Sequence, residues 1–162
     1  MNVVIRLALE KDIEFVFRVF AESRCEFQNL GWDAAHLEAF LREQFDFQQR
    51  TYASRHSYAT KEIIVADGVD CGYQVVDRSG QEIILVDLAV KPDFQARRVG
   101  SKVLEHLLEL ASRSRQNVVL QVAVGNPAQG LYERFGFSVV GEHGMYRSMR
   151  WSFKLEKTAV AA

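Results

Sequence analysis

The segment from Gln95 to Ser101 joins an apolar run to the start of a helical pattern, and its residue types suit an anion. A loop that ends at a helix N-terminus presents unpaired backbone N–H groups and the positive end of the helix dipole. Gly100 permits close approach of the backbone, and Arg97 and Arg98 add positive charge. Such a place can bind a pyrophosphate, although a strand-to-helix loop with two surface arginines fits the same residues. It is not a Walker phosphate loop, because the upstream glycine of that motif is missing.

Polar residues also interrupt two apolar patterns. Asp87 stands inside a run rich in Ile, Leu and Val, where an acidic side chain is unexpected unless it has a specific role. Gln44, Gln48 and Tyr52 share a face with an otherwise apolar helical stripe. Buried amides need hydrogen-bond partners, which a substrate can provide, as can the ordinary hydrogen bonds of a packed helix.

Other kinds of chemistry find little support. The four histidines form no metal-ligand spacing, and no serine lies in a G-x-S-x-G elbow. Cys25 and Cys71 form no C-x-x-C pair, and we expect both to be small buried hydrophobes in a reducing compartment. The sequence therefore predicts no metal site.

Size and charge narrow the class of protein further. The 162 residues suit one domain, expected over residues 1–154 with a C-terminal tail at 155–162. A formal net charge of −1 lacks the basic excess of nucleic-acid-binding proteins. No apolar run approaches the roughly 20 residues of a membrane span, and the first residues do not resemble a signal peptide. We predict a cytoplasmic protein with no nucleic-acid or membrane partner.

The elements that position these residues follow from the spacing of the apolar side chains. Helical spacing covers residues 13–20, a second helix from Asp33 as N-cap to Tyr52, and a third from residue 99 to 111. A short helix is expected at 127–135. Strands are expected at residues 3–7, 63–66, 69–76, 82–90, 118–124, 137–140 and 145–153, with Asp67-Gly68 as a tight turn. This order predicts a mixed sheet with helices on both faces.

With the loop placed between a strand and a helix, residues 95–100 resemble the Q/R-x-x-G-x-G/A motif of the Gcn5-related N-acetyltransferase (GNAT) superfamily. Gln95, Val99 and Gly100 match its first, fifth and sixth positions, and Arg98 stands at its first glycine. The resemblance implies that the loop amides hold the pyrophosphate of coenzyme A. The charge of the arginine can compensate for the missing glycine.

A second motif follows the strand at 118–124. Residues 126–137, NPAQGLYERFGF, resemble the family's N-P-A-x-x-L-Y-x-x-x-G-F signature, and residues 86–92 and 146–151 are similar to its flanking strands. Two motifs in the correct order identify the chain as similar to this superfamily over about residues 1–153. The resemblance implies an α+β (mixed α/β) GNAT fold, with a mostly antiparallel mixed sheet of about seven strands and about four helices on its faces.

The resemblance also implies roles for individual residues. Main-chain groups at 88–90 would bind the pantetheine arm of acetyl-coenzyme A, and Asn126 would contact it from the facing strand. Tyr132 would protonate the leaving thiolate, or else only pack under the coenzyme. The implied coenzyme-binding residues are Leu88, Ala89, Val90, Gln95, Ala96, Arg97, Arg98, Val99, Gly100, Ser101, Asn126 and Tyr132.

The acceptor amine must lose a proton. An alkylamine of pKa about 10.4 is neutral in roughly one molecule per 2,500 at pH 7, so a carboxylate base helps. Asp87 lies where some polyamine acetyltransferases of the family carry an acid, and Glu82 lies thirteen positions before Gln95, as in the histone-modifying branch. The two point to opposite faces of a strand unless a bulge intervenes. We favour Asp87 as the base. Its alternative role is structural, as a carboxylate that accepts hydrogen bonds from loop amides.

The expected function is direct transfer of acetyl from acetyl-coenzyme A to a primary amine of a small molecule or peptide, by a monomer or homodimer. The alternative is a non-catalytic acyl-coenzyme A sensor or interaction module that retains the fold. Family members build the acceptor site from their first two helices and last hairpin. In this chain that region holds Arg24, Glu26, Trp32, Gln44, Gln48 and Tyr52.

Overall fold

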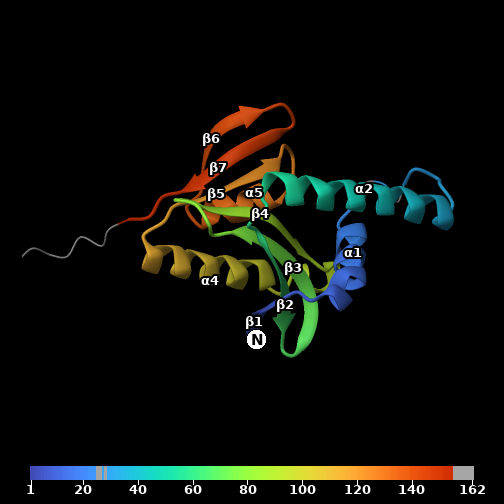
Figure 1. Ribbon diagram of the computed structural model, residues 1–162, viewed down its shortest axis with the longest axis horizontal. Helices are drawn as coiled ribbons and strands as arrows, with labels where there is room; N and C mark the ends of the chain where they lie inside the picture. The colour runs from blue at the N-terminus through green and yellow to red at the C-terminus, as the bar shows by residue number, and fades with distance from the viewer. Residues whose placement is uncertain (25–26, 28, 155–162) are drawn as a thin grey trace, which may run out of the picture.

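The computed structural model describes residues 1–24, 27 and 29–154, and these form a seven-stranded sheet of order β1-β2-β3-β4-β5-β7-β6 (Figure 1). The pair β4–β5 is parallel, and the other neighbours are antiparallel. The strands are β1 (Val3–Leu7), β2 (Thr60–Ala66), β3 (Val69–Asp77), β4 (Ile83–Val90), β5 (Val118–Ala123), β6 (Ser138–His143) and β7 (Tyr146–Trp151). Cys25, Glu26 and the expected tail at 155–162 lie outside the described residues.

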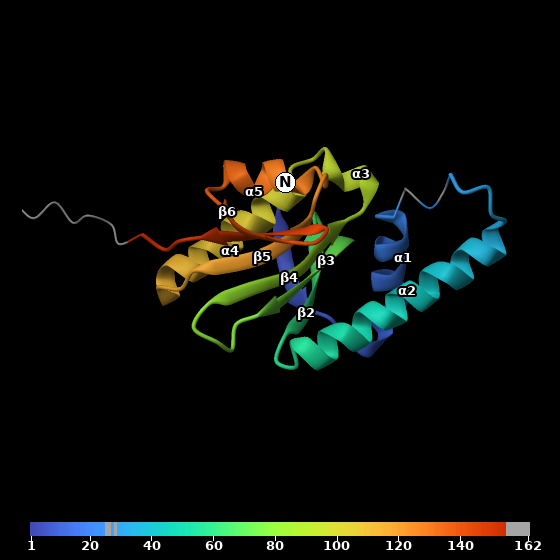
Figure 2. The same cartoon turned by 90° about the horizontal axis from the view of Figure 1, so that it is seen from above.

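Helices cover both faces of the sheet (Figure 2). They are α1 (Ile13–Glu22), preceded by the 3-10 turn η1 (Glu10–Asp12), α2 (Ala34–Arg55), α3 (Pro92–Gln95), α4 (Val99–Ser114) and α5 (Ala128–Arg134). α1 and α2 lie on one face, and α4 and α5 lie on the other. The predicted mixed α/β class is confirmed. No helix among the described residues is long and apolar enough to cross a membrane.

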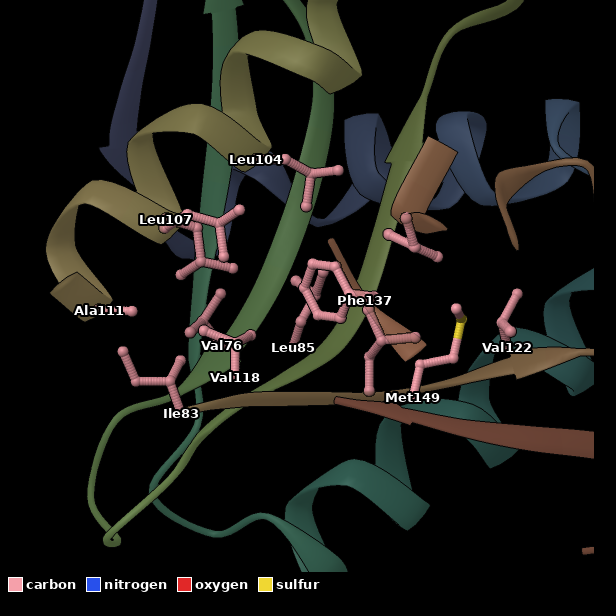
Figure 3. Packing of buried hydrophobic residues seen from close by; sticks show 13 residues of the cluster. Val76, Ile83, Leu85, Leu104, Leu107, Ala111, Val118, Val122, Phe137 and Met149 are labelled. Carbon is pink, nitrogen blue, oxygen red and sulfur yellow. The ribbon is translucent and has the colours of Figure 1, made fainter. Parts of the chain in front are cut away.

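Two of the hydrophobic clusters hold these layers together. On the α4 face, Leu104 and Leu107 pack over Leu85 and other apolar side chains of the sheet (Figure 3). On the other face, Phe17 of α1 and Phe45 of α2 meet edge to face, with ring centroids 5.5 Å apart. Burying each such side chain stabilises the fold by roughly 1.5–3 kcal/mol. The two faces therefore anchor the central strands on which the polar residues lie.

Local signals in the sequence match the observed ends of the elements. The Asp33 carboxylate accepts a hydrogen bond of 2.8 Å from the His36 backbone N–H, as expected of the N-cap of α2. Asp67 and Gly68 join β2 to β3 with φ of 48° and 79°, the positive values that a type I′ hairpin turn requires. Both predictions are confirmed.

A β-bulge in β4 sets the direction of Asp87. Val75 of β3 pairs with Asp87, whereas the next residue, Val76, pairs with Leu85, so Val86 is an extra residue on β4. Val86 joins the cluster under α1 and α2, and Leu85 joins the cluster under α4. Without the bulge, the alternation of side chains along a strand would turn Asp87 toward α4.

Gly72 lies where β3 and β4 approach each other closely. A Cβ at this position would clash with the carbonyl oxygen of Ala89 and lie 3.1 Å from the Cα of Val90. We expect Gly72→Ala to lower the free energy of unfolding by about 1–3 kcal/mol through overpacking. Denaturant titration measures this loss, with Gly80→Ala as the control, because its Cβ would meet only the Glu82 carbonyl oxygen at 3.8 Å. Equal midpoints for the two variants would contradict the prediction.

Candidate functional site

The parallel pair β4–β5 separates part-way along its length. The two strands are paired from Ile83–Val118 to Leu85–Leu120, and both continue beyond that point. Past Leu85, the edge of β4 that faces β5 has no ladder partner among the described strands. Its main-chain N–H and C=O groups, including those of residues 88–90, are therefore available to an extended ligand that lies along the strand.

The loop after β4 leads from this edge to the start of α4. The Gln95 side chain donates a hydrogen bond of 3.0 Å to the Val90 carbonyl oxygen, which closes the loop over the end of β4. α4 begins at Val99, and no side-chain hydrogen bond caps its N-terminus. Its first backbone N–H groups and the positive end of its dipole are thus available to an anion. Ala96 and the adjacent Arg97 are exposed.

Arg98 adopts the left-handed conformation, with φ of 60° and ψ of 24°, immediately before α4. Glycine adopts this conformation freely, whereas other residues lose roughly 1–2 kcal/mol in it. This position corresponds to the first glycine of the GNAT motif. A glycine at this position would adopt the same conformation without that cost.

Asp87 is the centre of a polar cluster on the α1–α2 face. The Tyr73 hydroxyl donates a hydrogen bond of 2.9 Å to its carboxylate. Burial raises the pKa of Asp87, and this shift is opposed by the Tyr73 hydrogen bond, by the charge of Arg24 and by the Tyr52 hydroxyl. The raised pKa makes the Asp87 carboxylate a stronger base than an exposed aspartate, and the Tyr73 hydrogen bond orients it.

Tyr132 of α5 lies close enough to Asp87 to be influenced by its charge. The side chain is 7% exposed and packs edge-on against Phe137, with ring centroids 5.7 Å apart. Burial, and then the Asp87 carboxylate, raise the pKa of Tyr132 to about 12. The phenol therefore stays protonated at neutral pH and can donate a hydrogen bond.

Lys61 belongs to the same cluster, although the sequence analysis did not select it. Lys61 of β2 is opposite Val75 of β3, which is itself opposite Asp87, so the three form one row across the sheet. The Lys61 ammonium donates a hydrogen bond to the Gln49 side-chain oxygen. Burial lowers the pKa of Lys61, and the charge of Asp87 opposes this shift. Lys61 stands between Thr60 and Glu62, before the apolar residues of β2, so no pattern in the sequence marked it.

The remaining predicted residues lie at various distances from this cluster. Asn126 is exposed, and its side-chain oxygen accepts a hydrogen bond of 2.9 Å from the Ala128 N–H at the start of α5. Glu82 precedes β4 and pairs with Arg150 of β7 at 3.1 Å, so the structure does not bring it to Asp87.

Two residues of the predicted acceptor site point elsewhere. Gln44 is exposed on α2. Trp32 is also exposed and meets the Phe40 ring edge-on, with centroids 5.2 Å apart. Within the described residues, the structure therefore brings Arg24 and Tyr52 to Asp87, and it places Gln48 one helical turn before Tyr52.

The family model of the acetyltransferase (GNAT) domain matches residues 59–139, half of the chain. The chain belongs to the GNAT acetyltransferase family. It is 30% identical over 108 residues to the ribosomal protein bS18-alanine N-acetyltransferase of Escherichia coli K12, a match that covers 65% of this chain and 72% of the relative. It is 36% identical over 77 residues to the enzyme of the same name from Salmonella typhimurium, and this match spans 46% of the chain and 52% of that relative.

Solved structures confirm the GNAT fold. The PaiA N-acetyltransferase of Thermoplasma acidophilum, solved in complex with coenzyme A, superposes with a TM-score of 0.72 at 18% identity. That match covers 94% of this chain and all of the other. The E. coli ribosomal-protein-S18-alanine N-acetyltransferase gives a TM-score of 0.66 at 18% identity, covering 96% of this chain and 98% of its own.

Proposed function

We propose that this GNAT protein uses acetyl-coenzyme A to acetylate a primary amine directly, in a ternary complex and in the cytoplasm. The observation that supports this most is the hydrogen bond between Tyr73 of β3 and Asp87 of β4, at the level where β4 has left β5 and where Tyr132 senses the charge of Asp87. The unpaired edge of β4 suits a pantetheine arm, and the uncapped start of α4 suits a pyrophosphate. These two features support places for the pantetheine arm and the pyrophosphate beside a candidate base.

In this mechanism Asp87 takes a proton from the acceptor ammonium. The neutral nitrogen then forms a bond to the thioester carbonyl carbon, gives up its second proton to solvent, and the carbon–sulfur bond breaks. Tyr132 donates a hydrogen bond to the departing sulfur. Full transfer of its proton to a thiolate of pKa about 8.5 would be uphill by about 3.5 pKa units, or roughly 5 kcal/mol. We therefore assign Tyr132 to stabilising the thiolate, which takes its proton from solvent.

The relatives guide the choice of acceptor. Those from E. coli and Salmonella are named for acetylating an alanine of ribosomal protein bS18, so their acceptor is a protein amine. We propose a protein or peptide amine as the first acceptor to test for this chain, beside small amines. Acetylation is followed by release of free coenzyme A thiol. A protein that binds the coenzyme but releases no thiol with any amine would instead be a non-catalytic sensor.

Coenzyme binding can be tested separately from catalysis. We expect acetyl-coenzyme A at 100 times its dissociation constant to stabilise the native chain by roughly 2.7 kcal/mol, seen as a rise in Tm. Gly100→Glu should abolish this rise, because it puts negative charge at the start of α4, and its Cβ would already contact Leu131 at 3.4 Å. Gly80→Glu is the matched control, since it adds the same charge in an exposed loop. An undiminished rise with Gly100→Glu would mean that the coenzyme binds elsewhere.

A further inference from the structure

The side of α2 that faces the sheet changes from apolar to polar along the helix. Its first half buries Leu41 and Phe45 in the cluster with α1. The following turns carry Gln48, Gln49 and Tyr52, all half-buried. A helix that packed only for stability would continue its apolar stripe. The change occurs over the part of the sheet that carries Lys61, Tyr73 and Asp87.

Two atoms in this polar layer are buried without a partner. The side-chain oxygen of Gln48 and the side-chain nitrogen of Gln49 have no hydrogen-bond partner among the described residues. The other end of the Gln49 amide is engaged, because its oxygen accepts from Lys61. Buried amide atoms are ordinarily satisfied, so one free acceptor and one free donor in the same layer call for a group that supplies both.

The charges around Asp87 restrict what that group can be. Arg24 and Lys61 both act electrostatically on Asp87, and the phenols of Tyr52, Tyr73 and Tyr132 are influenced by its charge. An ammonium can approach the Asp87 carboxylate. A second ammonium a few ångströms along the acceptor would meet Lys61 or Arg24, and like charges at that distance repel.

We propose that Lys61, together with Gln48 and Gln49, contacts the group next to the reacting amine of the acceptor and favours an amide there over a second amine. The carbonyl oxygen of the acceptor accepts from Lys61 or from the free nitrogen of Gln49. Its N–H donates to the free oxygen of Gln48. Diamines and polyamines offer donors only, and they carry the charge that Lys61 repels. This proposal rests on the proposed function and names the specificity-determining residues of the same site.

The test compares glycinamide with 1,3-diaminopropane as acceptors of acetyl from acetyl-coenzyme A. We expect wild type to prefer glycinamide in kcat/KM, and Lys61→Glu to shift the ratio of the two values toward the diamine by at least tenfold, mainly through KM. Lys61→Gln, which only removes the charge, should shift it by less. Lys11→Gln is the control, since Lys11 is exposed on η1. An unchanged ratio in Lys61→Glu overturns the proposal.

Two further measurements keep the result decisive. Unchanged coenzyme affinity and Tm show that each variant is folded, and Lys61→Gln carries the test if Lys61→Glu does not fold. Gln48→Leu with Gln49→Leu should raise KM for glycinamide about tenfold, and an unchanged KM would mean that these amides bind hydration water only.

Acceptor binding also separates this proposal from the proposed function. If wild type releases no thiol with any amine, direct acetylation fails. Calorimetry of the coenzyme-bound protein then still ranks the two amines: a preference for glycinamide that Lys61→Gln removes supports the specificity proposal, and equal binding of both amines by wild type overturns it.

Discussion

Asp87→Asn is expected to lower kcat/KM for the acceptor by about 10²–10⁴-fold at neutral pH, the usual effect of removing a general base. Asparagine keeps the shape of the side chain and an oxygen that can accept from Tyr73, but it cannot take the proton of the ammonium. The burial that raises the Asp87 pKa also predicts an acidic limb in the wild-type pH profile, displaced upward from about 3.9. The variant should lose this limb and recover activity as the acceptor deprotonates at high pH.

The stability of Asp87→Asn distinguishes a catalytic role of Asp87 from a structural one. A carboxyl whose pKa is raised by folding stabilises the native state below its unfolded pKa, and this contribution is lost as pH rises through its folded pKa. At neutral pH the charged form is therefore unfavourable in the fold, and Asp87→Asn should not lower Tm there. Glu82→Gln is the control and should leave kcat/KM within a few-fold. A fall in Tm with uniform loss of activity across pH would mark Asp87 as structural, and a larger defect in Glu82→Gln would make that residue the base.

Tyr132→Phe should reduce the single-turnover rate by about 10²–10³-fold, as removal of one hydrogen-bond donor to a developing anion typically does. Phenylalanine retains the ring and its edge-on contact with Phe137, so the dissociation constant of acetyl-coenzyme A should change little. Loss of an interaction made only in the transition state has this kinetic form. Single-turnover kinetics and calorimetry, run on both proteins, measure the two quantities.

The control for this change is Tyr58→Phe, because Tyr58 is 77% exposed. If Tyr132→Phe turned over at the wild-type rate, the ring would have only a packing role and water alone would stabilise and protonate the thiolate. Loss of coenzyme affinity in step with turnover would instead mean that the hydroxyl supports ground-state binding.

The features that were predictable from the sequence depend on neighbouring residues in the chain. The helical spacing of α4, the N-cap at Asp33 and the turn at Asp67-Gly68 all arise from contacts within a few residues, so their patterns can be read along the chain. Asp87 was predictable as a candidate for a related reason, since a carboxylate within an apolar strand conflicts with its surroundings. The motifs likewise lie within single strand–loop–helix units.

The arrangement around Asp87 was decided by the tertiary structure. Period-2 alternation cannot reveal the bulge at Val86, because the extra residue exists only relative to the register of β3, and this bulge turns Asp87 toward α2. Lys61 reaches the site because β3 lies between β2 and β4 and aligns it with Asp87, from 26 positions earlier in the chain. The left-handed backbone of Arg98 goes against the preference of its own residue type, so the residue type could not predict it. Residue types thus supplied the candidates, and the register between strands determined which of them meet.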